Sequence, residues 1–133
     1  GHVPVRHLDN LIYFPDVMPT LAAVAGASEY LPSRCDGIDL WPLILGGQLD
    51  TDDRLLYWEF PGKQRAARRG DWKAVSVKKN APLELYNIRE DETESNNLAD
   101  KYPEKVAEFE RQMQQARTPS PYWPLPGEQP AKE

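Results

Sequence analysis

A series of short runs between residues 55 and 88 constrains the fold of this chain more than any other feature. Turn-forming residues separate the runs, which cover residues 55–60, 64–69, 72–77 and 83–88. Short strands separated by Pro, Gly, Asn and Asp are typical of an antiparallel meander. Side chains alternate across a strand, so Trp72 and Ala74 should face one way and Lys73 and Val75 the other. The runs predict a four-stranded antiparallel sheet with one buried face.

Two other segments have helical patterns. Residues 15–25 place apolar side chains at helical spacing and are followed by Gly26, a stop signal. Residues 103–117 begin with Pro103, which suits the first helical position. Their apolar stripe consists of Val106, Phe109, Met113 and Ala116. Because a stripe of this kind needs an apolar partner, we expect it to lie on the buried face of the sheet, in an α+β fold.

The chain should divide into three parts. Residues 1–50 hold the first helix and a short apolar turn at 40–45, and polar residues 48–53 mark a boundary. Residues 51–117 hold the meander at 54–88 and the helix at 103–117. Residues 118–133 are rich in proline, which can neither continue a helix nor donate to a strand ladder.

Composition excludes some classes of function. The net charge of −5 and the isoelectric point near 5.1 argue against a nucleic-acid binder held by phosphate contacts. No apolar run approaches the roughly 18 residues of a membrane-spanning helix. Cys35 is the single cysteine, so an internal disulfide is excluded.

No catalytic or metal-binding residue is expected in this chain. A metal site needs three or four converging ligands, and the histidines His2 and His7 have no matching set of partners. The acidic segment 90–100 does not follow the spacing of a calcium-binding loop, and we interpret it as a solvated loop. Nothing in the sequence supplies Cys35 with a base to lower the pKa of its thiol, so we interpret it as a packing residue.

An ordered series of motifs resembles the C-terminal subdomain of type I sulfatases, in the alkaline phosphatase superfamily. It consists of residues 54–60 (RLLYWEF), 62–64 (GKQ), 67–73 (ARRGDWK), 84–88 (ELYNI) and 97–99 (NLA) with Pro103. Residues 14–21 (FPDVMPTL) and 36–40 (DGIDL) resemble segments at the end of the sulfatase catalytic α/β domain. The fold implied is a helix and loop segment from that domain, then the sheet and its C-terminal helix.

The resemblance also implies where the chemistry lies. Sulfatases carry a nucleophile motif whose Cys or Ser is oxidised to formylglycine, beside a calcium ion. Residues 32–34 (PSR) with Cys35 do not match that motif, because its first position falls on Tyr30. The nucleophile and the calcium ligands are therefore expected upstream of residue 1, in a catalytic domain that would be the partner of this chain. The resemblance suggests a periplasmic or secreted parent enzyme, and the isolated chain should be inactive.

Four residues are candidates for the substrate rim of such an enzyme. They are Trp58, Lys63, Gln64 and Arg68. Cations beside aromatic rings suit sulfated sugars, since the rings stack on sugar faces and the cations pair with anions. A small basic patch beside Trp58 and Trp72 would provide this. The alternative is a solvated hairpin face, with both tryptophans in the core beneath the C-terminal helix.

Other functions remain open on the sequence. The chain could be a stand-alone carbohydrate- or sulfate-binding domain that uses the four rim residues. It could also come from a related phosphodiesterase or phosphonate hydrolase, since the same motifs do not separate sulfate from phosphate esters. If the chain is a fragment of a larger enzyme, apolar residues that normally pack on the large domain would lack partners. We therefore expect the isolated chain to self-associate. These residues are Leu21, Val24, Trp41, Leu43 and Ile44.

Overall fold

The computed structural model describes residues 3–60, 64–78, 81–120, 122 and 124. The chain forms two compact units, Gly1–Asp53 and Arg54–Glu133. Within the part that the structure describes, no helix is long and apolar enough to span a membrane.

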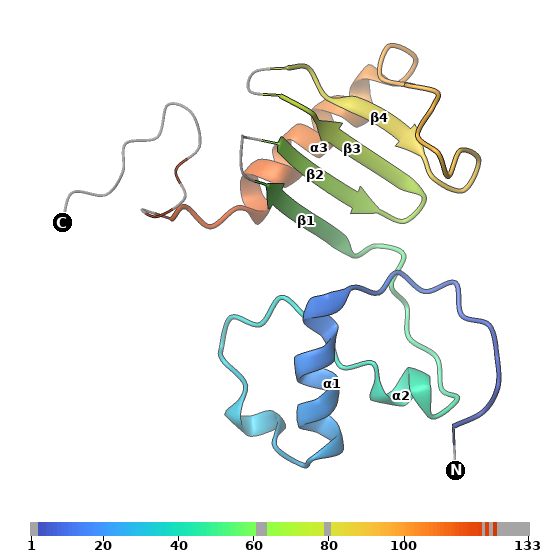
Figure 1. Cartoon of the computed structure of the whole chain (residues 1–133), viewed down its shortest axis with the longest axis vertical. Coiled ribbons are helices and arrows are strands. Elements are labelled where there is room, and N and C mark those ends of the chain that lie inside the picture. The colour runs from blue at the N-terminus through green and yellow to red at the C-terminus, as the bar shows by residue number, and fades with distance from the viewer. Residues whose placement is uncertain (1–2, 61–63, 79–80, 121, 123, 125–133) are drawn as a thin grey trace. The chain divides into compact units, whose positions relative to one another are not determined.

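The second unit is built on a four-stranded antiparallel sheet (Figure 1). Its strands are β1 (Leu55–Phe60), β2 (Gln64–Arg69), β3 (Trp72–Ser76) and β4 (Glu84–Asn87), and they pair in sequence order. Arg69 pairs with Trp72, so only Gly70 and Asp71 connect β2 to β3. Gly70 has φ +55°, a backbone conformation that glycine adopts without a steric penalty. The predicted meander is confirmed.

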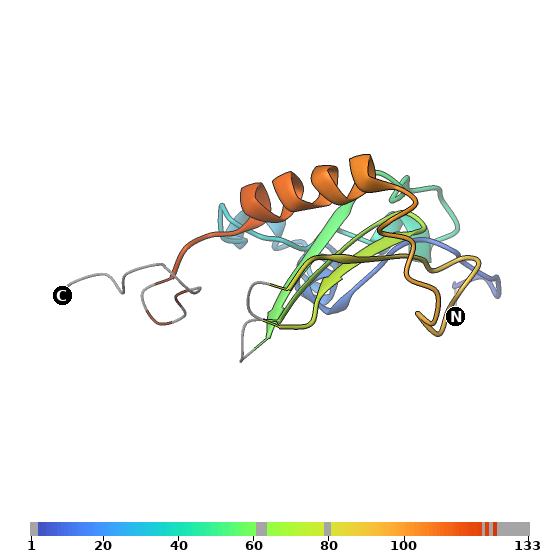
Figure 2. The same cartoon turned by 90° about the horizontal axis from the view of Figure 1, so that it is seen from above.

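Helix α3 (Pro103–Ala116) covers one face of this sheet (Figure 2). The core between them contains Ala67, Ala74, Leu83, Leu85, Phe109 and Met113. Phe109 and Met113 belong to the apolar stripe expected from the sequence, and Val106 packs against the same core. The central strands β2 and β3 contribute alanines, whose small side chains leave room for the larger helix residues. The predicted packing of the C-terminal helix on the sheet is confirmed.

The segment after β4 covers the outer edge of that strand. The amide of Leu85 donates to the Asn97 side-chain oxygen at 3.0 Å, and the amide of Leu98 donates to the Leu85 carbonyl at 2.7 Å. The same Asn97 oxygen accepts from Ala99 at 3.0 Å. These bonds satisfy backbone groups that an edge strand would leave open, which explains the structural role of residues 97–99.

A buried ion pair connects the end of α3 to β1. The Nε of Arg117 lies 2.7 Å from Oε1 of Glu59, and the two side chains are only 7% and 17% exposed. The hydroxyl of Tyr57 donates to the same carboxylate oxygen at 2.6 Å. Burial and this bond raise the pKa of Tyr57 well above its ordinary value. The Glu59 carboxylate therefore contacts two side chains, Tyr57 of β1 and Arg117 just after α3.

The first unit is organised around helix α1 (Val17–Val24), which continues the short 3-10 helix η1 (Phe14–Asp16). Asp16 is fully buried, and its carboxylate accepts from the amides of Tyr13 and Ile38, each at 2.9 Å. One turn later the hydroxyl of Thr20 donates to the Asp16 carbonyl and accepts from the amide of Leu40. Asp16 at the end of η1 and Thr20 in α1 thus hold the loop at residues 38–40 in place.

Two shorter helices complete the first unit: η2 (Ser28–Tyr30) and α2 (Trp41–Ile44). The predicted turn at 40–45 is therefore one turn of helix. Arg6 donates to the carbonyls of Leu43, Gly46 and Gly47, where α2 ends. These contacts give the extended N-terminal segment a fixed position on this unit.

Candidate functional site

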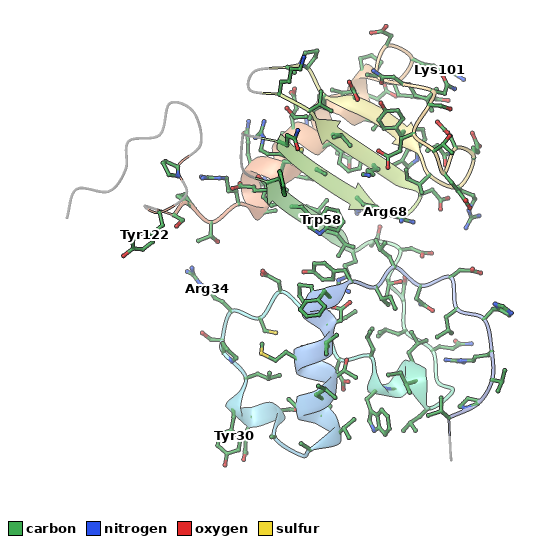
Figure 3. The ribbon with its side chains drawn as sticks, in the orientation of Figure 1. Tyr30, Arg34, Trp58, Arg68, Lys101 and Tyr122 are labelled. Atoms are coloured by element: carbon green, nitrogen blue, oxygen red, sulfur yellow. The ribbon has the colours of Figure 1, made fainter. Side chains whose placement is uncertain are left out.

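The face of the sheet opposite α3 carries three of the four predicted rim residues. Strand pairing places Trp58 opposite Ala66, Leu56 opposite Arg68 and Phe60 opposite Gln64. All six side chains share this face, because the facing residues Tyr57 and Ala67 belong to the core side. Trp58, Gln64 and Arg68 are therefore neighbours on two adjacent strands, and Trp58 and Arg68 are labelled in Figure 3. Lys63 lies outside the described residues.

The predicted basic patch beside both Trp58 and Trp72 is wrong, because these tryptophans lie on opposite faces. Trp72 is paired with Arg69, which is paired with Leu55 on the core side. Its ring packs edge-on against Tyr102, with centroids 5.2 Å apart, and Lys105 Nζ lies 4.7 Å from its centroid. Trp72 therefore stabilises the contact with α3. The alternative that placed both tryptophans beneath that helix holds only for Trp72.

The sheet face opposite α3 is called the open face below, and Arg68 is a positive charge on it. It is paired directly with Lys73 on β3, and like charges in that position repel. Lys73 forms an ion pair with Glu94, whereas Arg68 donates its Nε to the carbonyl of Gly70 at 3.1 Å. Among the described residues no carboxylate lies within ion-pair distance of Arg68. The positive charge of Arg68 is therefore left without a compensating anion in this part of the chain.

Tyr86 lies beside Lys73 on the same face and is buried. Its hydroxyl donates to Glu84 at 2.7 Å. Burial, followed by this bond, raises the pKa of Tyr86 to about 12. The neutral phenol is thus favoured in the folded state.

This shift predicts a loss of stability at high pH. The folded pKa exceeds the unfolded value of 10.0, so the stabilising contribution is complete below pH 10 and declines as the pH rises toward 12. Tyr86→Phe lacks this ionisation. We expect the difference in unfolding free energy between wild type and Tyr86→Phe to narrow over this range. Urea unfolding followed below pH 10 and near pH 12 measures it, and a difference that does not change with pH would contradict the assignment.

A second surface feature belongs to the first unit. Helix α1 contains no charged residue, and apolar side chains outside its loop-binding side are exposed: Phe14, Val17, Met18, Leu21 and Val24. Most of them line a pocket of about 610 Å³ with Arg34 and Cys35. Cys35 is half-buried there and forms no disulfide. A helix that is apolar on all sides is usually buried in the core of a larger protein.

Residues that could bind a metal ion do not converge in the described ranges. Within them the structure brings together no group of three or more His, Cys, Asp or Glu side chains suited to a cation. The acidic loop instead forms internal bonds. Asp91 accepts from the amides of Ser95 and Asn96, each at 2.8 Å, and these backbone bonds lower the pKa of its carboxyl.

Comparison with known proteins identifies the relationship of the chain. Over 134 aligned residues it is 31% identical to arylsulfatase A of Bos taurus, which covers 81% of this chain. The chain is related to the sulfatases. It spans about a quarter (26%) of the length of that sulfatase. No family model matches the sequence.

Solved structures share the fold of this chain, and a putative sulfatase from Bacteroides thetaiotaomicron is among them. It is 27% identical with a TM-score of 0.61, covering 75% of this chain and 23% of its own. Ps i-CgsB, solved in complex with k-i-k-neocarrahexaose, is 28% identical with a TM-score of 0.63, covering 75% of this chain and 23% of its own. A protein solved with its substrate D-glucosamine-2-N,6-O-disulfate is 25% identical with a TM-score of 0.59, covering 75% and 22%. The sulfatase resemblance predicted from the motif series is thus confirmed.

Proposed function

We propose that this chain is the C-terminal part of a sulfatase that hydrolyses sulfate esters on carbohydrates. The observation that carries the proposal is its similarity to arylsulfatase A over most of its own length and about a quarter of that enzyme. In this proposal the chain supplies stability and part of the substrate rim. It does not supply the reacting groups.

The catalytic groups of the parent enzyme would lie in another part of the protein. The described residues offer no convergent carboxylates for a calcium ion, and no step of the reaction is assigned to them. Formylglycine and calcium are expected in the catalytic domain. There they would provide the nucleophile and the positive charge that stabilises the sulfate group. The role left to this chain is to bind and orient the sugar.

The rim role is assigned to the open face of the β1–β2 hairpin. Trp58, Gln64 and Arg68 share that face. Lys63 is included as a rim residue on the sequence alone. The Trp58 side chain is 39% exposed, so a ligand bound to the second unit could contact its ring. An aromatic ring and a cation on adjacent strands are what a sulfated sugar requires.

The apolar side of α1 is proposed to pack on the catalytic domain. In the chain alone we expect this surface to drive self-association, because contiguous exposed apolar area promotes contact between molecules. Leu21 is 61% exposed and lines the pocket, so Leu21→Asp should reduce association without disturbing the buried bonds of Asp16.

Light scattering at increasing concentration measures this effect. We expect a dimer or larger species for the wild type and a shift toward monomer for Leu21→Asp. Tyr30→Asp is a matched control in the same unit, since Tyr30 is exposed and does not line the pocket (Figure 3). A monodisperse wild-type monomer at high concentration, or equal dissociation in both variants, would contradict the proposal.

A graft tests the proposed function itself. The matching region of bovine arylsulfatase A is replaced by this chain, and hydrolysis of p-nitrophenyl sulfate is measured alongside thermal unfolding. We expect the graft to fold and to retain turnover. Turnover should be lost when the nucleophile of the arylsulfatase A part is replaced. A graft that folds as stably as the parent enzyme but has no turnover would contradict the assignment as a sulfatase part.

A further inference from the structure

We propose that β1 pairs edge to edge with β1 of a second copy of this chain, so that two sheets join into one continuous antiparallel sheet. This interface is separate from the apolar side of α1, because it consists of backbone groups of the second unit. The pairing leaves the open face of each sheet uncovered. Three features of the second unit support it: the difference between the two sheet edges, the direction of the backbone groups, and the residues that would lie opposite each other.

The two edges of the sheet differ in how their backbone groups are satisfied. β1 and β4 are the outer strands (Figure 1). At the β4 edge residues 97–99 bind both the amide and the carbonyl of Leu85. At the β1 edge no backbone–backbone bond among the described residues joins Tyr57 or Glu59 to a segment other than β2. β1 also contains no proline or lysine, the residues that commonly protect an edge strand from further pairing.

The turn between β2 and β3 determines which backbone groups of β1 point outward. A two-residue turn closes on a hydrogen-bonded pair, which here is Arg69 and Trp72. Bonded and non-bonded pairs alternate along an antiparallel ladder, so β2 directs the backbone groups of Arg69 toward β3 and those of Ala66 toward β1. Trp58 is paired with Ala66, and its amide and carbonyl therefore bind β2. The residues on either side of Trp58 direct their backbone groups away from the sheet.

Antiparallel pairing centred on Trp58 satisfies these outward groups in both copies. Tyr57 of one copy then lies opposite Glu59 of the other, and the two residues exchange backbone hydrogen bonds. Trp58 lies opposite its own counterpart, and Leu56 lies opposite Phe60. Apolar side chains therefore meet on the open face, where Phe60 is 64% exposed in the single chain.

Charge and strand order favour this partner and this register. Glu59 is the one charged residue of β1, and Arg117 compensates it within the same chain. Pairing centred on Glu59 would place two carboxylates opposite each other, and pairing centred on Tyr57 would place Glu59 opposite Leu55. Among the described strands, β2 and β3 are paired on both sides and residues 97–99 cover β4. The edge that a second copy offers is therefore its own β1.

Amide hydrogen exchange, measured by NMR at low and high protein concentration, tests the pairing. The chain carries Leu21→Asp, so that association through α1 does not contribute. We expect the amides of Tyr57 and Glu59 to exchange at least about tenfold more slowly at high concentration. We expect little change at the amides of Trp58 and Leu85, because both are already bonded in the single chain.

A lysine substitution with a matched control separates edge pairing from general apolar contact. Phe60→Lys alters an exposed side chain, so the single chain should fold, and it places an ammonium group opposite an apolar side chain of the second copy. Val77→Lys adds the same charge just after β3, at a side chain that is 37% exposed. In the Leu21→Asp chain, sedimentation equilibrium measures dissociation. We expect Phe60→Lys to raise the dissociation constant at least about tenfold, and Val77→Lys to leave it within about twofold.

Three results would overturn the inference. The first is exchange at Tyr57 and Glu59 that does not depend on concentration, as when a segment of the same chain covers β1. The second is equal slowing at Tyr57, Glu59 and Trp58, and the third is equal dissociation of Phe60→Lys and Val77→Lys. The Leu21→Asp background separates this test from the association assigned to α1. The sulfatase assignment is tested independently by the graft, whose turnover requires no pairing between copies of this chain.

Discussion

Leu85→Ala should lower the free energy of unfolding of the second unit by about 2–5 kcal/mol. Leu85 is fully buried in β4, and it belongs to the core formed with Phe109 and Met113 of α3. Truncation removes buried methyl groups and leaves a cavity that the paired strands cannot easily close. Urea unfolding followed by tryptophan fluorescence measures the change.

A matched control makes this result specific to the core. Val77→Ala removes methyl groups from a side chain that is 37% exposed, just after β3. It should change the free energy of unfolding by no more than about 0.5 kcal/mol. A loss below 1 kcal/mol for Leu85→Ala would show that the helix does not depend on this core.

Arg117→Met should destabilise the chain by about 3–5 kcal/mol, because it removes the cation that contacts the buried carboxylate of Glu59. The ion pair is 2.7 Å long and its side chains are 7% and 17% exposed, so water cannot replace the lost charge. Adding Glu59→Gln should recover part of the loss, since the second change removes the uncompensated charge. Equilibrium unfolding of the two single variants and the double variant measures the coupling.

The exposed pair Arg69–Glu108 is the control for this prediction. Its side chains are 37% and 42% exposed, and the two atoms lie 3.2 Å apart. Solvent screens such pairs, and Arg69→Met should cost less than about 1 kcal/mol. Equal effects of Arg69→Met and Arg117→Met would contradict the distinction between the buried and the exposed pair.

The sheet and its helix were predictable because local patterns specify them. Gly70 and Asp71 form the turn between β2 and β3, and they are residues typical of turns. The apolar stripe that contains Phe109 and Met113 has a helical period. Bonds between distant residues were not predictable. The helical pattern at residues 15–25 contains Asp16 near its start, but it does not indicate that the Asp16 carboxylate accepts from the amide of Ile38. No spacing rule connects those positions, because the loop between them determines their approach.

The candidate site was predicted only in part, for a related reason. Alternation divides the side chains of one strand between two faces. It does not show which residues of the neighbouring strand lie on the face that the helix covers. The pairing of Trp58 with Ala66 and of Arg69 with Trp72 decides this, and it places the two tryptophans on opposite sides. Among the described residues Glu94 forms an ion pair with Lys73 and no carboxylate forms one with Arg68, a difference that sequence order does not indicate.

An assay of the isolated chain most directly tests the claim that the reacting groups of the enzyme lie outside this chain. The 133-residue chain is incubated with p-nitrophenyl sulfate and calcium, and release of p-nitrophenol is followed beside an active arylsulfatase A. The account predicts no turnover above buffer for the wild type or for Cys35→Ala. Saturable turnover by the wild-type chain, lost in Cys35→Ala, would contradict it and would place the nucleophile in this chain.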